Sequence, residues 1–245
     1  MGVVANCFFC LCIFVFSSQL QADPSEVTAP IEKVYVPYGF DDNDNTEIVV
    51  QGFFPNPCYR LGHAGYDVDH SNHRINVWVT SYFYPNSENV CPNMVIPFVQ
   101  GIKVGILPVG EYQVTFKGDY TKGVKLQVTR AKSDTPDDAL YAAVENAFVT
   151  INEKTGNHQI ILQGAYPYWF EGCQVLKELK LYRQPDVLVV LPEAELVDDE
   201  RCDSQLDSKR FTFTKDLGRK VEPSSLIHVR VLNGGSVNRM VWGVE

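Results

Sequence analysis

The sequence lacks the short motifs that mark the common classes of hydrolase and nucleotide-binding enzyme. It contains no G-x-S-x-G, no H-E-x-x-H and no P-loop. The cysteines beyond residue 22 include no C-x-x-C pair, which disfavours a structural zinc site. These absences predict a protein that is not an enzyme and uses no cofactor. A serine hydrolase stays open as an alternative, because a catalytic triad is recognised by its geometry.

A basic region is also missing. Residues 23–130 hold 8 Lys and Arg against 12 Asp and Glu, and residues 131–245 hold 13 against 18. The formal net charge of −9 is therefore spread over the whole chain. Nucleic acid is not an expected partner of such a sequence. An anionic membrane surface is disfavoured for the same reason.

Charged residues are absent from residues 1–22, where the apolar stretch covers only residues 7–16. Such a segment predicts a secretory signal peptide and is too short for a membrane span. Its removal near Asp23 gives a secreted or periplasmic chain with no transmembrane segment. Cleavage after Ser17 and an uncleaved anchor are the alternatives.

Four cysteines follow the predicted signal, and an even number in an exported chain favours disulfides. Four cysteines allow three pairings. An internal repeat selects one of them, because it places each pair within one copy. The predicted disulfides are Cys58–Cys91 and Cys173–Cys202, with separations of 33 and 29 residues.

The repeat is clearest between residues 48–61, IVVQGFFPNPCYRL, and residues 160–176, IILQGAYPYWFEGCQVL. Each copy has a β-branched run, Gln-Gly, aromatic residues with a proline, and then a cysteine. The segments on both sides match in order, with different loop lengths. The sequence therefore predicts a tandem duplication of one module.

Each predicted module holds about seven short β-rich runs separated by Pro, Gly and Asn turns, which is typical of an antiparallel β-sandwich. Alternation is clear in the first module, where Ile75, Val77 and Val79 share one face and Trp78 lies on the other. The all-β architecture resembles the immunoglobulin and fibronectin-III class in size and strand number. That resemblance implies no function. The predicted modules are residues 23–130 and 146–245.

A linker at residues 131–145 separates the two modules, and its composition predicts a short helix. Ser133 or Thr135 is suited to cap the helix and Pro136 to its first turn, and the two aspartates that follow complement the helix dipole. A helical linker would hold the modules more stiffly than a Gly/Ser tether.

An acidic loop at residues 39–47 resembles part of a calcium-binding loop, with oxygen ligands at Asp41, Asn43 and Asn45. The EF-hand pattern fails, because Thr46 stands where glycine is needed. We predict a solvated turn without metal, with calcium binding as the alternative.

A second group of ligand residue types lies in residues 63–74, where His63, His70 and His73 accompany two aspartates. Hairpin geometry brings about two of these side chains together. A zinc site needs three or four converging ligands. The sequence therefore predicts no metal there.

Aromatic residues gather beside prolines and near cysteines in three loops, at residues 53–59, 81–86 and 165–173. Loops at the ends of sandwiches often carry recognition, and Tyr and Trp are favoured contact residues. Packing around the disulfides is the alternative role. The predicted contact residues are Tyr82, Tyr84, Tyr166, Tyr168, Trp169 and Phe170.

These features together predict an exported, non-enzymatic binding or structural protein. Its expected partner is a protein or a glycan, recognised through the aromatic loops. The alternative is an inhibitor of a secreted hydrolase or protease, in which a rigid exposed loop blocks the enzyme.

Overall fold

The computed structural model describes residues 23–84, 91–118, 121, 123–165, 173–197, 210–218 and 220–241. These residues form sixteen β-strands and one short 3-10 turn at Leu232–Gly234. The predicted all-β class is confirmed. The described part of the chain contains no helix of the length and hydrophobicity needed to cross a membrane.

The first half of the chain contains two sheets, which we call A and B. In sheet A the strand order is β1-β6-β8-β9-β3, and β5 pairs with β6; sheet B has the order β2-β4-β7. The strands are β1 (Ser25–Thr28), β2 (Ile31–Tyr35), β3 (Phe40–Asp41), β4 (Thr46–Phe54), β5 (Tyr59–Asp69), β6 (Arg74–Phe83), β7 (Ile96–Gly105), β8 (Gly110–Thr115) and β9 (Val124–Thr129).

The second half also contains two sheets, C and D. Sheet C has the order β12-β13-β15-β16, and sheet D has the order β10-β11-β14. The strands are β10 (Val144–Ile151), β11 (His158–Ala165), β12 (Cys173–Arg183), β13 (Val187–Val197), β14 (Arg210–Asp216), β15 (Leu226–Val231) and β16 (Gly235–Met240).

Strand direction and number differ from the predicted seven-stranded antiparallel, immunoglobulin-like module. The pairs β6/β8 and β13/β15 are parallel, because the chain leaves each large sheet for one strand of the small sheet before it returns. The first half has nine strands, since the short strands β1 and β3 join sheet A. Most strand pairs are antiparallel as predicted, and the prediction is wrong for β6/β8, β13/β15 and the short pair β3/β9, which are parallel.

The predicted linker helix at residues 131–145 is also wrong, because these residues form bends and then enter β10. Asp137 has a φ of +61°, outside the right-handed helical region. Its backbone N–H donates to the Asp44 carboxylate at 3.1 Å. Tyr141 forms a β-bridge with Glu193. Partners elsewhere in the chain thus replace the intrahelical hydrogen bonds that a helix would make.

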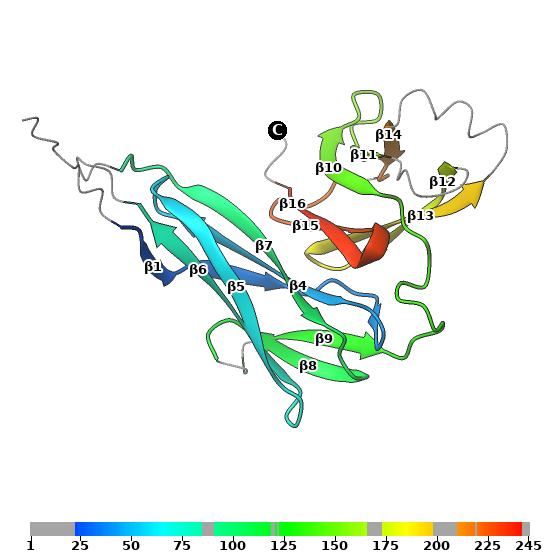
Figure 1. Cartoon of the computed structure of the whole chain (residues 1–245). Helices are drawn as coiled ribbons and strands as arrows, with labels where there is room; N and C mark the ends of the chain where they lie inside the picture. The colour runs from blue at the N-terminus through cyan, green and yellow to red at the C-terminus, as the bar shows by residue number, and fades with distance from the viewer. Residues whose placement is uncertain are drawn as a thin grey trace, which may run out of the picture.

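The four sheets lie in the order A, B, C, D, with an apolar cluster between each neighbouring pair. Sheets A and B enclose one cluster and sheets C and D another. A third cluster lies between B and C, where Tyr35, Val49, Val187, Val189 and Leu226 meet. Strands β4 and β13 are therefore buried on both faces. Figure 1 shows the strands of the two halves, with the first half in blue to green and the second in green to red.

A buried ion pair adds to the contact between the halves. Arg230 of β15 donates through Nη1 to Asp44 Oδ2 at 3.1 Å and through Nη2 to the Gly39 carbonyl. Its guanidinium also lies 4.2 Å from the centre of the Phe40 ring. A positive charge over an aromatic face is favourable. This arginine therefore fixes the acidic loop of the first half to the second half.

His228, two residues before this arginine, is buried in the same contact. Asn238 Nδ2 donates to Glu47 Oε1 at 2.6 Å, so its Oδ1 faces His228 Nδ1 at 2.8 Å. The ring proton is thus on Nδ1, and Nε2 has no partner among the described residues. Burial lowers the pKa of His228, and the Glu47 charge opposes that shift in part.

Acidification should therefore destabilise the chain through His228. The pKa of His228 is lower in the folded state than in the unfolded chain. The stabilisation that comes from keeping this ring neutral in the fold is therefore fully present above about pH 6.5 and is lost as the pH falls below that value. We expect a slope of up to about 1.4 kcal/mol per pH unit in urea unfolding between about pH 6.5 and 5.5. His228→Gln should flatten the slope, whereas the exposed His63→Gln should not. Equal slopes in all three proteins would contradict this assignment.

Candidate functional site

The outer face of sheet A presents one aromatic and polar surface. Ile75, Val77 and Val79 of β6 are buried against sheet B, as the alternation predicts. Side chains at alternating positions point to opposite faces of a strand. Trp78 and Tyr82 therefore lie on the outer face.

Trp78 lies over the backbone of the neighbouring strand. It pairs in register with Gly65 of β5. A Cβ atom at Gly65 would be only 2.3 Å from Cζ2 of the indole, so glycine is what lets the ring rest there. The side chain is still 39% exposed. One side of the indole is thus supported by the strand while the ring stays accessible to a ligand.

A polar cluster lies two to four residues further along β6. Thr80 Oγ1 donates to Glu26 Oε1 at 2.7 Å, and His63 Nδ1 lies 3.5 Å from the same oxygen. The Tyr82 hydroxyl is 3.1 Å from His63 Nδ1. The Thr80 hydrogen bond, followed by that of His63, lowers the pKa of Glu26. Glu26 is therefore an ionised, solvent-accessible acceptor at neutral pH.

The cluster brings hydroxyl groups, an imidazole and a carboxylate together on the outer face of sheet A. An activated hydroxyl needs a base that accepts its proton, with that base oriented by a third group. Here the Thr80 hydroxyl bonds to Glu26, and the Tyr82 hydroxyl contacts the His63 ring. The surface combines an exposed indole with a carboxylate, an imidazole and hydroxyls, so it offers both apolar area and polar groups to a ligand.

The predicted contact residues have different positions. Tyr82 belongs to the outer surface of sheet A, together with His63. Tyr84 is exposed just after β6, and its backbone N–H donates to the Cys58 carbonyl at 2.9 Å. The remaining predicted contacts lie outside the described residues: Tyr166, Tyr168, Trp169 and Phe170.

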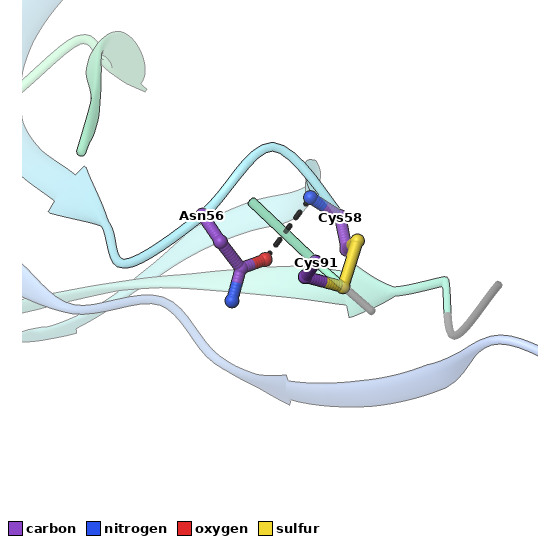
Figure 2. The surroundings of a disulfide bond; sticks show 3 residues. All are labelled: Asn56, Cys58 and Cys91. Carbon is purple, nitrogen blue, oxygen red and sulfur yellow. Dashed lines mark hydrogen bonds between the residues drawn. A yellow bond between two sulfur atoms is a disulfide. The ribbon is translucent and has the colours of Figure 1, made fainter. Parts of the chain in front are cut away.

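The predicted Cys58–Cys91 disulfide is confirmed (Figure 2). The Cα atoms are 6.0 Å apart, and the Cys58 N–H donates to Asn56 Oδ1 at 3.0 Å. Phe54 and Tyr59 stack at 5.7 Å between ring centres beside it. In this loop the aromatic residues therefore pack the sandwich end. The Cys173–Cys202 pairing lies outside the described residues, because Cys202 and the Cys173 side chain are not described.

The acidic loop connects the first half to the linker. Asp41 and Asp44 are buried, so the prediction of a solvated turn is wrong for these two residues, whereas Asn45 is exposed. Asn43 Nδ2 donates to the Ser133 carbonyl at 2.8 Å, and Asp41 accepts the Asn43 N–H at 3.2 Å. Burial raises the pKa of Asp41. Asn45 lines a neighbouring hollow beside the linker.

No group of three His, Cys, Asp or Glu side chains that could hold a metal ion occurs within the described ranges. The oxygen atoms of the acidic loop are instead engaged with backbone N–H groups and with Arg230. The geometry therefore gives no support to the calcium alternative at Asp41, Asn43 and Asn45.

Comparison with known proteins gives one family. Residues 48–126 match the ORF11 beta-sandwich domain. This match confirms the predicted β-sandwich for the segment that runs from β4 into β9. No curated protein and no solved structure matches the chain. The ORF11 beta-sandwich match includes His63, Gly65, Trp78 and Tyr82, whereas Glu26 lies before it.

Of the residues of this surface, the sequence predicted only Tyr82 as a contact residue, whereas His63 was considered only as a metal ligand. The alternation at residues 75–80 was a usable signal, because it places a large indole on the outer face of a strand whose other face is core. No sequence signal joins Glu26 to Thr80, which are 54 residues apart.

Proposed function

We propose that this is an exported, non-enzymatic binding protein that recognises a glycan through the outer face of sheet A. The observation that carries the proposal is the exposed Trp78 ring, supported by Gly65 and flanked by the Glu26–His63–Tyr82 cluster. An indole face covers the apolar face of a sugar ring, and the polar side chains bond its hydroxyls.

Secretion or a periplasmic location is part of the proposal. The uncharged residues 1–22 have the pattern of a signal peptide. The Cys58–Cys91 disulfide supports an oxidising compartment, since disulfides are rare where thiols are kept reduced.

We also infer that the two halves are tandem copies of one sandwich module. The pairing order β2-β4-β7 of sheet B corresponds to β10-β11-β14 of sheet D. Gly52 and Gly164 supply independent support. A Cβ at either glycine would be 2.4 Å from Cζ of a phenylalanine, Phe98 in one half and Phe211 in the other. A duplicated module explains why the same Gln-Gly pair precedes both cysteine loops.

Trp78→Ala tests glycan recognition directly. We expect it to weaken binding to the best ligand of a glycan array by about 30-fold, the equivalent of the roughly 2 kcal/mol typical of an aromatic hot spot. Gly65→Ala keeps the indole but displaces it, and should weaken binding as well.

Phe148→Ala is the matched control, because Phe148 is an exposed aromatic residue of sheet D. It should leave binding unchanged. Melting curves of all variants show whether each is folded. The proposal fails if the folded Trp78→Ala protein binds as tightly as the parent, or if the parent binds no glycan.

A further inference from the structure

A groove of about 780 Å³ lies between the two halves, beside the linker. Its walls come from the β2–β3 loop, the linker, β12, β13 and β15. This volume is in the range of small-ligand sites, which occur preferentially between domains. The groove is separate from the outer face of sheet A.

The charge of the groove is opposite to that of the chain. Its lining has two acidic residues, Asp138 and Glu193, and five basic ones. The whole chain has a net charge of −9. An excess of one sign of charge in a cleft raises the local concentration of ligands of the opposite sign. The basic residues are Lys132, Lys177, Lys180, Arg183 and Arg230.

Three of these basic residues are engaged inside the protein, and one of them is Arg183, whose Nη2 donates to the Leu217 carbonyl at 2.9 Å. Arg230 pairs with Asp44, and Lys180 Nζ bonds to Glu193 Oε1 at 2.6 Å, which raises the pKa of Lys180. Lys132 is highly exposed and lies 4.0 Å from Asp138. Lys177 is exposed on β12 and has no ion-pair partner among the described residues. Lys132 and Lys177 are thus the charges most accessible to a ligand.

Two tyrosines line the groove from opposite halves. Tyr38 is 53% exposed and Tyr182 is 51% exposed. The Gln184 side chain fixes their separation, because it accepts from the Tyr38 N–H and donates to the Val36 carbonyl, each at 3.1 Å. The groove therefore presents two exposed aromatic side chains, and the backbone that carries Tyr38 is tied to the strand end that follows Tyr182.

We propose that this groove binds an acidic oligosaccharide, with Tyr38 and Tyr182 against the sugar rings and Lys132 and Lys177 bonding to the carboxylate or sulfate groups. Nucleic acid is the less suitable polyanion. Its high charge density calls for an extended basic surface, whereas this groove is a small basic area on an acidic protein. The groove does not include Trp78. It differs from the outer face of sheet A in requiring a charged ligand.

Binding is tested by titration of the mature chain with an oligogalacturonate and, separately, with a heparin-derived oligosaccharide. These probes distinguish carboxylate from sulfate as the recognised group. Affinity should fall at least tenfold between about 0.05 M and about 0.5 M NaCl, because accessible charges are screened. Binding of either probe with this salt dependence supports the proposal, and binding of neither overturns it.

Variants assign the site. Lys177→Glu and Tyr182→Ala should each weaken binding at least tenfold, whereas Tyr182→Phe, which keeps the ring, should bind like the parent. Lys154→Glu makes the same charge change on an exposed turn of the second half and should have little effect. Equal losses for Lys177→Glu and Lys154→Glu would overturn the site, as would tighter binding of single-stranded DNA or poly-glutamate. Trp78→Ala should leave this binding unchanged, which separates this inference from the proposed function.

Discussion

Asp44→Ala should destabilise the protein by about 3–5 kcal/mol, because it leaves the Arg230 guanidinium buried without its counter-charge. The side chains of Arg230 and Asp44 are only 6% and 3% exposed, so water replaces little of the lost interaction. Asp44 also accepts the backbone N–H groups of Asp41 and Asp137. Urea unfolding of the mature chain measures the loss.

The double variant Asp44→Asn/Arg230→Met separates the cost of an unpaired buried charge from the cost of altered side-chain packing. It removes both charges and keeps an acceptor at residue 44, so it should be more stable than Asp44→Asn alone. Asp42→Ala is the control within the loop. Asp42 is only half-buried and accepts one hydrogen bond, from the Ala131 N–H at 2.7 Å, among the described residues. It should cost about 1 kcal/mol. A loss below about 1 kcal/mol for Asp44→Ala would show that the ion pair does not hold the halves together.

The contact between the two halves shows how far strand burial could be predicted from the sequence. Residues 187–191, VLVVL, form a continuous apolar run, which is the pattern of a strand buried on both faces. Val189 packs against sheet B and Val190 against sheet D. The apolar run therefore indicated packing on both faces of β13. The alternation at residues 75–80 correctly indicated that β6 has one buried face and one free face.

The linker shows why local propensity failed. Ser133, Pro136 and Asp137 have the chemistry of a helix start, but a helix of this length is marginal without packing. Long-range hydrogen bonds to Asp44 and to β13 satisfy the same backbone groups. The short-range pattern could not show these partners, because they lie 50 or more residues away along the chain.

The groove escaped prediction for a related reason. Tyr38, Lys132, Lys177 and Arg230 are spread over most of the chain, and each lies in a stretch of mixed charge. Net charge summed over either half is negative. Only the contact of sheet C with sheet B brings these side chains to one place, so a composition argument over segments cannot detect the local change of sign.

Removal of the Cys58–Cys91 disulfide by the double change Cys58→Ser/Cys91→Ser should lower the free energy of unfolding by about 3–4 kcal/mol. The bridge spans a sequence separation of 33 residues, and the expected loss is the closure entropy of a loop of that size in the unfolded chain. Denaturant unfolding of the variant, compared with the oxidised and the fully reduced parent, measures it. The fully reduced parent should unfold at a lower denaturant concentration than the variant, because reduction also opens the Cys173–Cys202 disulfide that the sequence predicts.

Asn56→Ala is the control for local packing, because it removes the acceptor of the Cys58 N–H but keeps the disulfide. It should cost only about 1 kcal/mol. Intact mass after alkylation of the folded parent gives a second readout, in which neither Cys58 nor Cys91 should react. Labelling of either cysteine, or an unchanged midpoint in the double variant, would contradict the bridge. Tyr59 pairs with Phe83 at the end of β5 and β6 that the disulfide holds, whereas the Trp78 indole rests on Gly65 in the middle of the paired strands. The double variant should therefore lose little of the proposed glycan binding under conditions in which it stays folded.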